Sequence, residues 1–371
     1  HEINETTIID HNFNNLFPKS IETISNYFLE DDYWTHDICS KIIKKFYQKK
    51  FKINYYKAND IKKKIAEFIV KQDVQKNNKN KFFQYCTPLK KKQKYVFIST
   101  LLGFKRDLIL NLKFKQLPIL SLPILNNNFA VNLNIRKKIK LNFHTNNEFE
   151  KFILELIPEQ LPTTFLEGFK NLYYEVENSD FPEKPKFIIG ACLVWWDTFF
   201  MLYAGMKVDK YKTKIINFQH GGEYGTTKID WADKHEINIS DSFLTWGWKS
   251  NDSKKIFPFG IIRPLNLIKK INRKNSKKIL LVLRSSTKFH RLSSTLCGPK
   301  DWNRYIEDNL KIPFNLDQNI KKELIIRFGP NQKKWECENW KKIHPDLTKK
   351  DFLSCNILKL LKKTKLVVTD N

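Results

Sequence analysis

Residues 215–225 read IINFQHGGEYG, a short apolar segment followed directly by a polar turn that contains three glycines. The apolar residues predict a buried β-strand, and Gln219, His220, Gly221 and Gly222 stand where that strand would end. In an open parallel sheet, ligands bind beyond the carboxyl ends of the strands. Glycines at such a place let backbone N–H groups come close to an anionic group. We therefore expect this turn to form part of a ligand site.

Predicted strands and helices alternate on both sides of the turn. Apolar runs at Phe187–Ile189 and Phe243–Trp246 predict further strands, and a second alternation has predicted strands at Ile279–Leu283, Leu324–Arg327 and Leu366–Thr369. Short apolar strands divided by helices are typical of parallel sheets that are covered on both faces. We expect an α/β protein with two Rossmann-like domains and a cleft between their strand ends.

The first 180 residues have a different pattern, with a single glycine, Gly103, before residue 168. Lys94–Leu102 predicts a strand that runs into a helix or turn. Apolar residues at three- and four-residue spacing predict amphipathic helices over Ile21–Phe28, Cys39–Tyr47, Ala58–Val70 and Phe149–Ile157. Residues 1–180 are therefore expected to be a mainly helical region with a few strands.

One apolar stretch, Phe187–Met206, is long enough to span a membrane and carries a single charge, Asp197. A charge near the middle of a span costs about 2.5 to 3.5 kcal/mol. The stretch also has glycines near both ends, and Trp195 and Trp196 stand in its middle rather than at its ends. We therefore interpret it as a buried strand followed by the helix Cys192–Ala204.

His220 is the first candidate for chemistry, because an imidazole in a glycine-rich turn can act as a base, an acid or a hydrogen-bond donor to a phosphate. The alternative is that His220 only orders the turn. Glu223 is the nearest carboxylate that could activate an acceptor hydroxyl, and Tyr224 and Gly225 complete the candidate turn. His235 and Glu236 stay open as members of the site. Trp246 and Trp248, which flank Gly247, are expected to be packing residues rather than sugar-stacking ones.

Arginine is rare in this chain, so the positions at which it occurs are informative. Arg284, Ser285 and Ser286 follow one predicted strand, and Arg327 ends the next. A guanidinium, two hydroxyls and backbone N–H groups can together hold the phosphates of a nucleotide. The alternative is that each arginine lies on the surface at a strand end.

Composition excludes several classes of protein. The 371 residues carry a net charge of +27, but only eight of the 66 basic residues are arginine and they are spread along the chain, which does not favour a nucleic-acid-binding protein. Basic runs such as Lys90–Lys94 and Arg136–Lys138 could still contact anionic lipid. The six cysteines are scattered and suit a reducing cytoplasm. No metal-binding or cofactor-binding motif occurs, so metal-free chemistry without a cofactor is favoured.

Several of these segments together resemble a known family. The segments that carry the resemblance are Asp197–Gly205, FQHGGEYG at Phe218–Gly225, EINISDSFLTWGW at Glu236–Trp248, ILLVLR at Ile279–Arg284 and LVVTDN at Leu366–Asn371. Through them the chain resembles a transferase family encoded in bacterial surface-carbohydrate gene clusters of the O-antigen and lipopolysaccharide type. The resemblance covers residues 185–371, about half of the chain.

The resemblance implies a two-domain glycosyltransferase fold of the B type (GT-B), distantly similar to capsule Kdo transferases and glycerophosphotransferases. It implies a mainly helical region at 1–180 that contributes to or precedes the acceptor domain, an acceptor-side domain at 181–265 and a partial donor domain at 277–371. By the same analogy His220 lies at the interdomain cleft, and Arg284, Ser285 and Ser286 face the phosphates of a nucleotide-sugar donor.

The sequence therefore predicts a metal-independent enzyme that transfers a sugar or related group from a nucleotide-activated donor to a glycan or lipid-linked acceptor. We expect it in the cytoplasm, with possible peripheral contact with the inner membrane. The alternative is a non-catalytic, lysine-rich module that binds anionic lipid, glycan or nucleic acid. Both ends of the chain read as cut, since it begins at His1 and ends just after a predicted strand, so its donor site is expected to be incomplete.

Overall fold

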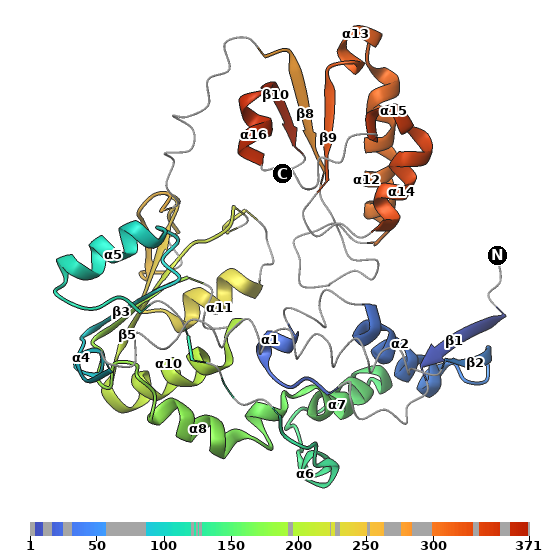
Figure 1. Cartoon of the computed structure of the whole chain (residues 1–371). Helices are drawn as coiled ribbons and strands as arrows, with labels where there is room; N and C mark the ends of the chain where they lie inside the picture. The colour runs from blue at the N-terminus through green and yellow to red at the C-terminus, as the bar shows by residue number, and fades with distance from the viewer. Residues whose placement is uncertain are drawn as a thin grey trace. The chain divides into compact units, whose positions relative to one another are not determined.

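The computed structural model describes residues 4–9, 17–24, 32–56, 87–119, 122–123, 125, 128–191, 196–222, 224–226, 231–250, 253–262, 276–283, 299–328, 334–348 and 357–369. The chain forms two compact units, unit 1 (His1–Arg263) and unit 2 (Pro264–Asn371), and each is described by itself. Figure 1 shows the elements of both, coloured along the chain.

Unit 1 is built on a five-stranded parallel sheet in the order β3-β4-β5-β6-β7. The strands predicted at residues 94–102, 187–189, 215–218 and 243–246 are confirmed as β3, β4, β5 and β6. Their order in space is their order in sequence, so the reversal of strand order that marks a doubly wound Rossmann sheet is not found among the described strands of this unit. The strand bounds are β3 (Tyr95–Ile98), β4 (Phe187–Gly190), β5 (Lys214–Phe218), β6 (Ser242–Thr245) and β7 (Ile256–Pro258).

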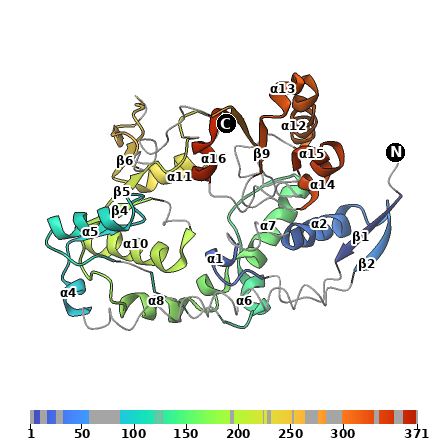
Figure 2. The same cartoon turned by 45° about the horizontal axis from the view of Figure 1, so that its top comes forward.

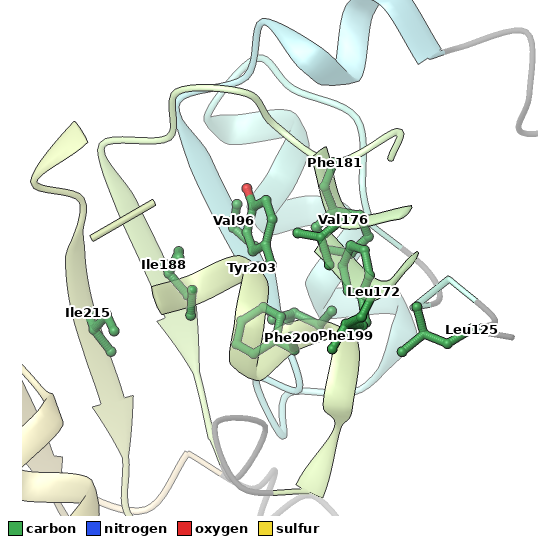
Figure 3. Packing of buried hydrophobic residues seen from close by; sticks show 12 residues of the cluster. Val96, Leu125, Leu172, Val176, Phe181, Ile188, Phe199, Phe200, Tyr203 and Ile215 are labelled. Atoms are coloured by element: carbon green, nitrogen blue, oxygen red, sulfur yellow. The ribbon is translucent and has the colours of Figure 1, made fainter. Parts of the chain in front are cut away.

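Helices α8 (Phe169–Glu177) and α10 (Thr198–Tyr211) cover this sheet and form its core with it. Figure 3 shows side chains of α8 and α10 in one cluster with Val96, Ile188 and Ile215, which belong to the neighbouring strands β3, β4 and β5. Tyr203 is buried at the centre, and its hydroxyl donates to the carbonyl of Pro182 at 2.7 Å. Burial raises the pKa of Tyr203 far above its ordinary value.

Asp197 explains why the apolar stretch 187–206 is not one long helix. Its carboxylate caps the N-terminus of α10, accepting from the N–H of Phe200 at 2.8 Å, so the stretch divides into the strand β4 and a helix that begins at Thr198. The expectation of a strand followed by a helix is confirmed by β4 and α10, and the helix ends later than predicted, at Tyr211 rather than Ala204. Residues 192–195 lie outside the described residues. Among the described residues, we found no helix with the length and apolar character that crossing a bilayer requires.

The N-terminal part of unit 1 is mainly helical with short strands. β1 (Glu5–Ile9) and β2 (Lys52–Tyr56) form a separate two-stranded parallel sheet. The helices predicted at 39–47 and 149–157 lie within α2 (Asp32–Phe46) and α7 (Glu148–Gln160), apart from Tyr47 just beyond α2. The prediction at 58–70 lies outside the described residues, and 21–28 is described only as far as residue 24. The other elements here are α1 (Ile21–Thr23), α4 (Thr87–Lys91), α5 (Phe104–Lys113), α6 (Leu133–Lys138) and η4 (Thr163–Phe165).

Unit 2 contains a three-stranded parallel sheet in the order β10-β8-β9. The chain leaves β8 (Lys278–Val282) for β9 (Leu324–Arg327) on one side and then returns past β8 to β10 (Thr364–Thr369) on the other. This reversal of strand order is the doubly wound arrangement. The three strands predicted at 279–283, 324–327 and 366–369 are confirmed.

Alternate residues of the strands in unit 2 serve opposite faces of the sheet, as the two-residue period of a strand requires. Leu281 and Ile326 pack with Leu310 and Trp340 on one face, whereas Leu280 and Ile325 pack with Leu360 on the other. Figure 2 shows the helices of this unit together with β9. They are α12 (Pro299–Lys311), η6 (Ile312–Asn315), α13 (Gln318–Lys321), α14 (Lys334–Ile343), α15 (Pro345–Thr348) and α16 (Ile357–Lys362).

Candidate functional site

Gln219 holds the turn that follows β5. Its side chain is buried, and its amide N–H₂ group donates to the carbonyl of Gly221 at 2.7 Å. Its amide oxygen accepts from the backbone N–H of Trp246 and from the indole N–H of Trp248, both at 2.8 Å. The indole N–H of Trp246 donates to the backbone carbonyl of Gln219 at 3.0 Å. One buried amide therefore ties the end of β5 to the segment that follows β6.

His220 lies next in a compact polar cluster with Tyr224 and Glu236. The Tyr224 hydroxyl forms hydrogen bonds with His220 Nε2 and with Glu236 Oε2, the latter at 2.9 Å. Glu236 Oε1 lies 3.3 Å from His220 Nε2. The Glu236 side chain is fully buried, whereas 24% of the His220 side chain is exposed. The cluster thus has a buried acidic end and an imidazole that reaches the surface.

Helix α11 (Trp231–Ile239) supplies the acidic side of this site. Asp233 and Glu236 are three residues apart and share one helix face. Glu236 contacts Tyr224, and Asp233 Oδ2 accepts from the N–H of Gly225 at 3.3 Å. His235, between them, is exposed. The helix therefore turns two carboxylates toward the glycine turn and keeps His235 on its solvent side.

The two tryptophans that follow β6 brace the turn. A Cβ atom added to Gly225 would lie 3.2 Å from the Trp248 ring, and Gly225 has a φ of +72° that favours glycine. A Cβ atom added to Gly222 would lie 3.9 Å from the Trp246 ring. Both indole N–H groups bond to Gln219. These contacts agree with the prediction that Trp246 and Trp248 are packing residues.

The segment 240–248 also fixes the other parts of the cluster. Phe243 stacks on Tyr224 with ring centroids 5.6 Å apart, and the Ser240 hydroxyl donates to the carbonyl of Glu236. The Asn217 side chain donates to Ser240 Oγ at 2.9 Å. The two sequence motifs FQHGGEYG and SDSFLTWGW are therefore one network of contacts in the folded chain.

One assignment of protons is consistent with the hydrogen bonds between His220, Tyr224 and Glu236. Tyr224 has one hydroxyl proton and donates it to Glu236 Oε2, so its oxygen accepts from His220 Nε2. Nε2 then carries the ring proton, next to the Glu236 carboxylate as well. In this tautomer the lone pair of the neutral ring is on Nδ1. The buried carboxylate can stabilise the positive charge that arises when Nδ1 gains a proton.

The predicted phosphate-binding residues belong to unit 2, and Arg327, which the structure describes, lies at the carboxyl edge of its sheet. Arg327 is the last residue of β9 and pairs with Val282 of β8. Its backbone carbonyl accepts from the N–H of Leu283 at 2.9 Å. Arg284, Ser285 and Ser286 follow Leu283 but lie outside the described residues, as does Glu223 of unit 1. The edge from which residues 284–286 leave is thus the edge that carries Arg327.

A second basic region of unit 2 lies at the opposite, amino edge of the same sheet. A pocket of about 630 Å³ there is lined by the first residues of β8 and β9 and by residues of α13, α15 and α16. Its lining includes five lysines and one aspartate: Lys278, Lys321, Lys322, Lys359, Lys363 and Asp346. An anion therefore has two possible places on unit 2, and only the carboxyl edge agrees with where ligands bind in doubly wound sheets.

Comparison with protein families places the whole chain in one of them. A model described as LIC12162 family transferase matches residues 1–371. The chain belongs to this family. As a LIC12162 family transferase it is an enzyme that moves a chemical group between substrates. Comparisons with curated proteins and with solved structures found no match.

In this LIC12162 family transferase, the structure brings some of the candidate residues together and adds a carboxylate that the sequence had left open. Gln219, His220 and Tyr224 lie together as the turn suggested, with Gly221, Gly222 and Gly225 around them. Glu236 was only an open alternative, yet it is the carboxylate that contacts His220. The i, i+3 pair of acids in α11 was the signal for it. Within the described part of the chain, no three His, Cys, Asp or Glu side chains gather as ligands for a metal ion.

Proposed function

We propose that this transferase moves a sugar or related group from a nucleotide-activated donor to a hydroxyl group of a surface-glycan acceptor. The observation that carries the proposal is the His220–Tyr224–Glu236 cluster at the carboxyl end of β5, where a fully buried carboxylate contacts a partly exposed imidazole. Buried carboxylates are normally paired, and the partner of this one is an imidazole, the side chain that most often serves as a general acid or base.

In the proposed reaction His220 is the general base. Nδ1 takes the proton of the acceptor hydroxyl while that oxygen forms a bond to the anomeric carbon of the donor. The bond from this carbon to the nucleotide phosphate breaks, and the electron pair leaves with the phosphate. Glu236 and Tyr224 hold the ring through Nε2 and stabilise the imidazolium.

Donor binding is assigned to the carboxyl edge of unit 2. β8 is the strand at which the strand order reverses, and Arg284, Ser285 and Ser286 follow it in the chain. Arg327 ends the neighbouring strand. Guanidinium groups bind phosphate oxygens in a bidentate manner, so these two arginines would stabilise the departing nucleotide. We place the reaction in the cytoplasm, in the assembly of surface polysaccharide or lipopolysaccharide, and assign no cofactor to it.

Calorimetry of the full chain with a panel of CMP-, CDP- and UDP-sugars tests the donor assignment. One nucleotide sugar should bind, and Arg327→Gln should weaken that binding by about tenfold or more, because a charge-assisted phosphate contact is worth roughly 1.5 to 3 kcal/mol. Lys359→Gln, at the amino edge, is the matched control and should bind as the unaltered chain does. Loss of binding only in the Lys359 variant would contradict this assignment and indicate that the donor binds in the lysine-lined pocket at the amino edge.

The non-catalytic alternative predicts a different result in the same experiments. A lysine-rich binding module would bind polyanions in a salt-dependent way, would keep that binding in His220→Ala, and would bind no nucleotide sugar. That combination would contradict the proposed transfer reaction.

A further inference from the structure

Helix α5 (Phe104–Lys113) holds its polar side chains against the protein. The Thr100 hydroxyl donates to the Asp107 carboxylate, and the Asn111 side chain donates to the Asp107 carbonyl at 2.8 Å. Gln116, just beyond the helix, donates to Asn111 Oδ1 at 3.0 Å and to the carbonyl of Tyr95 in β3 at 2.9 Å. Thr100, Asn111 and Gln116 are all buried. Polar contacts therefore attach much of this helix to the edge of the sheet.

Other positions of α5 carry large apolar side chains that are exposed. Phe104, Ile109 and Leu112 are 63%, 53% and 59% exposed. Phe104 and Leu112 are eight residues apart, so they lie on one stripe of the helix with Leu108 between them. Figures 1 and 2 both show α5 at the outside of unit 1, near the end of its sheet. The helix thus exposes large apolar side chains of the kind that surface helices usually turn toward the core.

Positive charge surrounds this apolar stripe. From Thr87 to Leu117 the chain has eight basic residues and a single acidic one, Asp107, whose carboxylate is bonded to Thr100. The basic residues are Lys90, Lys91, Lys92, Lys94, Lys105, Arg106, Lys113 and Lys115.

The short helix α4 extends the same surface. The Gln93 side chain, just after α4, donates to the carbonyl of Leu117 at 3.0 Å and accepts from its N–H at 3.2 Å. This pair of bonds fixes the end of α4 beside the chain that leaves α5. Leu89 of α4 is 64% exposed, and Lys92 and Lys94 are exposed too. Exposed leucine and lysine therefore continue beyond the C-terminal end of α5.

We propose that this α4–α5 surface binds an anionic lipid membrane, with Phe104, Ile109 and Leu112 inserted at the headgroup boundary and the flanking lysines on the headgroups. Amphipathic helices with lysine and arginine beside an apolar stripe bind membranes in this way, lying in the interface. A second copy of the chain would bring the same positive charge to the contact, and the two surfaces would repel. The inference concerns where the protein binds and goes beyond the proposed transfer reaction.

Vesicle co-sedimentation of the full chain tests it. The protein should bind vesicles of phosphatidylcholine mixed with phosphatidylglycerol, should bind pure phosphatidylcholine much less, and should be released by salt. The double variant Phe104→Ser with Leu112→Ser should partition about tenfold less or lower still. Lys105→Gln with Lys113→Gln should reduce binding by roughly 25-fold, since each basic residue near the surface contributes about fivefold.

Tyr174→Ser and Lys170→Gln are the matched controls, because both residues are exposed on α8 of the same unit. Both variants should bind the mixed vesicles as the unaltered chain does. The proposal is overturned if the unaltered chain does not bind mixed vesicles, if it binds both vesicle types equally, or if the α5 variants bind like the controls. It is also overturned if sedimentation shows a dimer that the Phe104 and Leu112 changes abolish while vesicle binding persists.

Nucleotide-sugar binding of the same α5 variants is measured in parallel. All of them should keep the affinity of the unaltered chain, since the changed residues lie in unit 1 and the donor is assigned to unit 2. Failure of the membrane proposal would therefore leave the donor assignment untouched, and failure of donor binding would leave the vesicle result unaffected.

Discussion

Glu167 and Glu236 of unit 1 are both buried carboxylates paired with basic side chains, and they have different surroundings. Arg136 and Glu167 form a bidentate pair at 2.8 and 2.7 Å, and both are buried. Arg136 also donates to the carbonyls of Pro158 and Leu161, at 2.8 and 2.9 Å, at the C-terminal end of α7. Glu236 is as deeply buried, but its partner His220 reaches the surface.

The difference separates a structural pair from a chemical one. Arg136 uses its donors on Glu167 and on the carbonyls that end α7, so the pair joins α6, α7 and the segment after η4 and presents nothing to a substrate. His220 carries an imidazole, the group most often used as a general acid or base, and Glu236 and Tyr224 hold one of its nitrogens. A buried carboxylate thus contributes to folding at one place and, in our proposal, to catalysis at the other.

The largest expected effect is on transfer by the His220 variant. His220→Asn should lower the turnover rate by about 10²- to 10⁴-fold, the usual contribution of a general base. Donor affinity should stay as it is, because the donor is assigned to unit 2. His235→Asn, an exposed neighbour on α11, is the matched control and should keep full activity. A His220 variant that transfers at the normal rate would remove the distinction between the two pairs.

The next prediction concerns stability and the Arg136–Glu167 pair. Arg136→Met should lower the free energy of unfolding of unit 1 by about 3 to 5 kcal/mol, because it leaves the Glu167 carboxylate buried without its partner. Lys151→Met, which breaks an exposed pair with Glu148, should cost less than about 1 kcal/mol. Urea denaturation followed by tryptophan fluorescence measures both. Equal losses in the two variants would show that burial of the Arg136 pair does not matter.

Glu236→Gln asks whether the second carboxylate works through His220. The amide has nearly the same shape but no charge, so the ring stays in place while the imidazolium loses its stabilisation. We expect the rate of transfer to fall by about 10- to 100-fold, as for other groups that orient a histidine. KM for the donor should not change. Unfolding of this variant in conditions where Asp233→Asn stays folded would instead indicate a structural role.

A smaller effect is expected from the glycines of the turn. Gly225→Ala should destabilise unit 1 by roughly 1 to 2 kcal/mol, because an L residue is disfavoured at a φ of +72° and its Cβ would press on the Trp248 ring. The matched change is Gly221→Ala, where the nearest atom to an added Cβ is 3.8 Å away and φ is not positive. That variant should unfold at the normal midpoint. Thermal denaturation of the two glycine variants and of the unaltered chain measures the difference in their midpoints.

The smallest expected effect is on how the free energy of unfolding depends on pH under acidic conditions. Burial raises the pKa of Glu167, but the hydrogen bonds from Arg136 and from the N–H of Asn132 outweigh it and hold the pKa below its ordinary value of 4.5. The stability that this lowered pKa contributes is therefore present above pH 4.5 and is lost as the pH falls through the folded-state pKa. Glu167→Gln should show a shallower loss of stability over that acid range, measured by urea midpoints at several pH values.

Local patterns predicted the strands of the two larger sheets except β7, because runs such as IINF, ILLVL and LIIR are apolar enough to be buried whatever surrounds them. They did not predict β1, β2 or β7. They could not predict the pairing. β3 lies beside β4 although 88 residues separate their ends, and β8 lies between β10 and β9. Strand order depends on contacts between distant segments, which no local window contains.

The same dependence on distant contacts decides which residues of the candidate site could be predicted from the sequence. His220 was a candidate because its glycines adjoin it in sequence, whereas Glu236 comes to it from a helix 16 residues further on. Gln219 was a candidate as part of the same turn, but its bonds to Trp246 and Trp248 could not be predicted, because these residues follow another strand. The residues adjacent in sequence could be predicted, and those brought together by the sheet could not.

The most direct test of the account is a double-mutant cycle on the transfer rate with His220→Asn and Glu236→Gln. If Glu236 acts only through the imidazole, the double variant should be about as slow as the His220 single variant, because groups that act as a unit are not additive. If the two losses multiply instead, Glu236 acts independently of His220, and the cluster is not the catalytic unit that we propose.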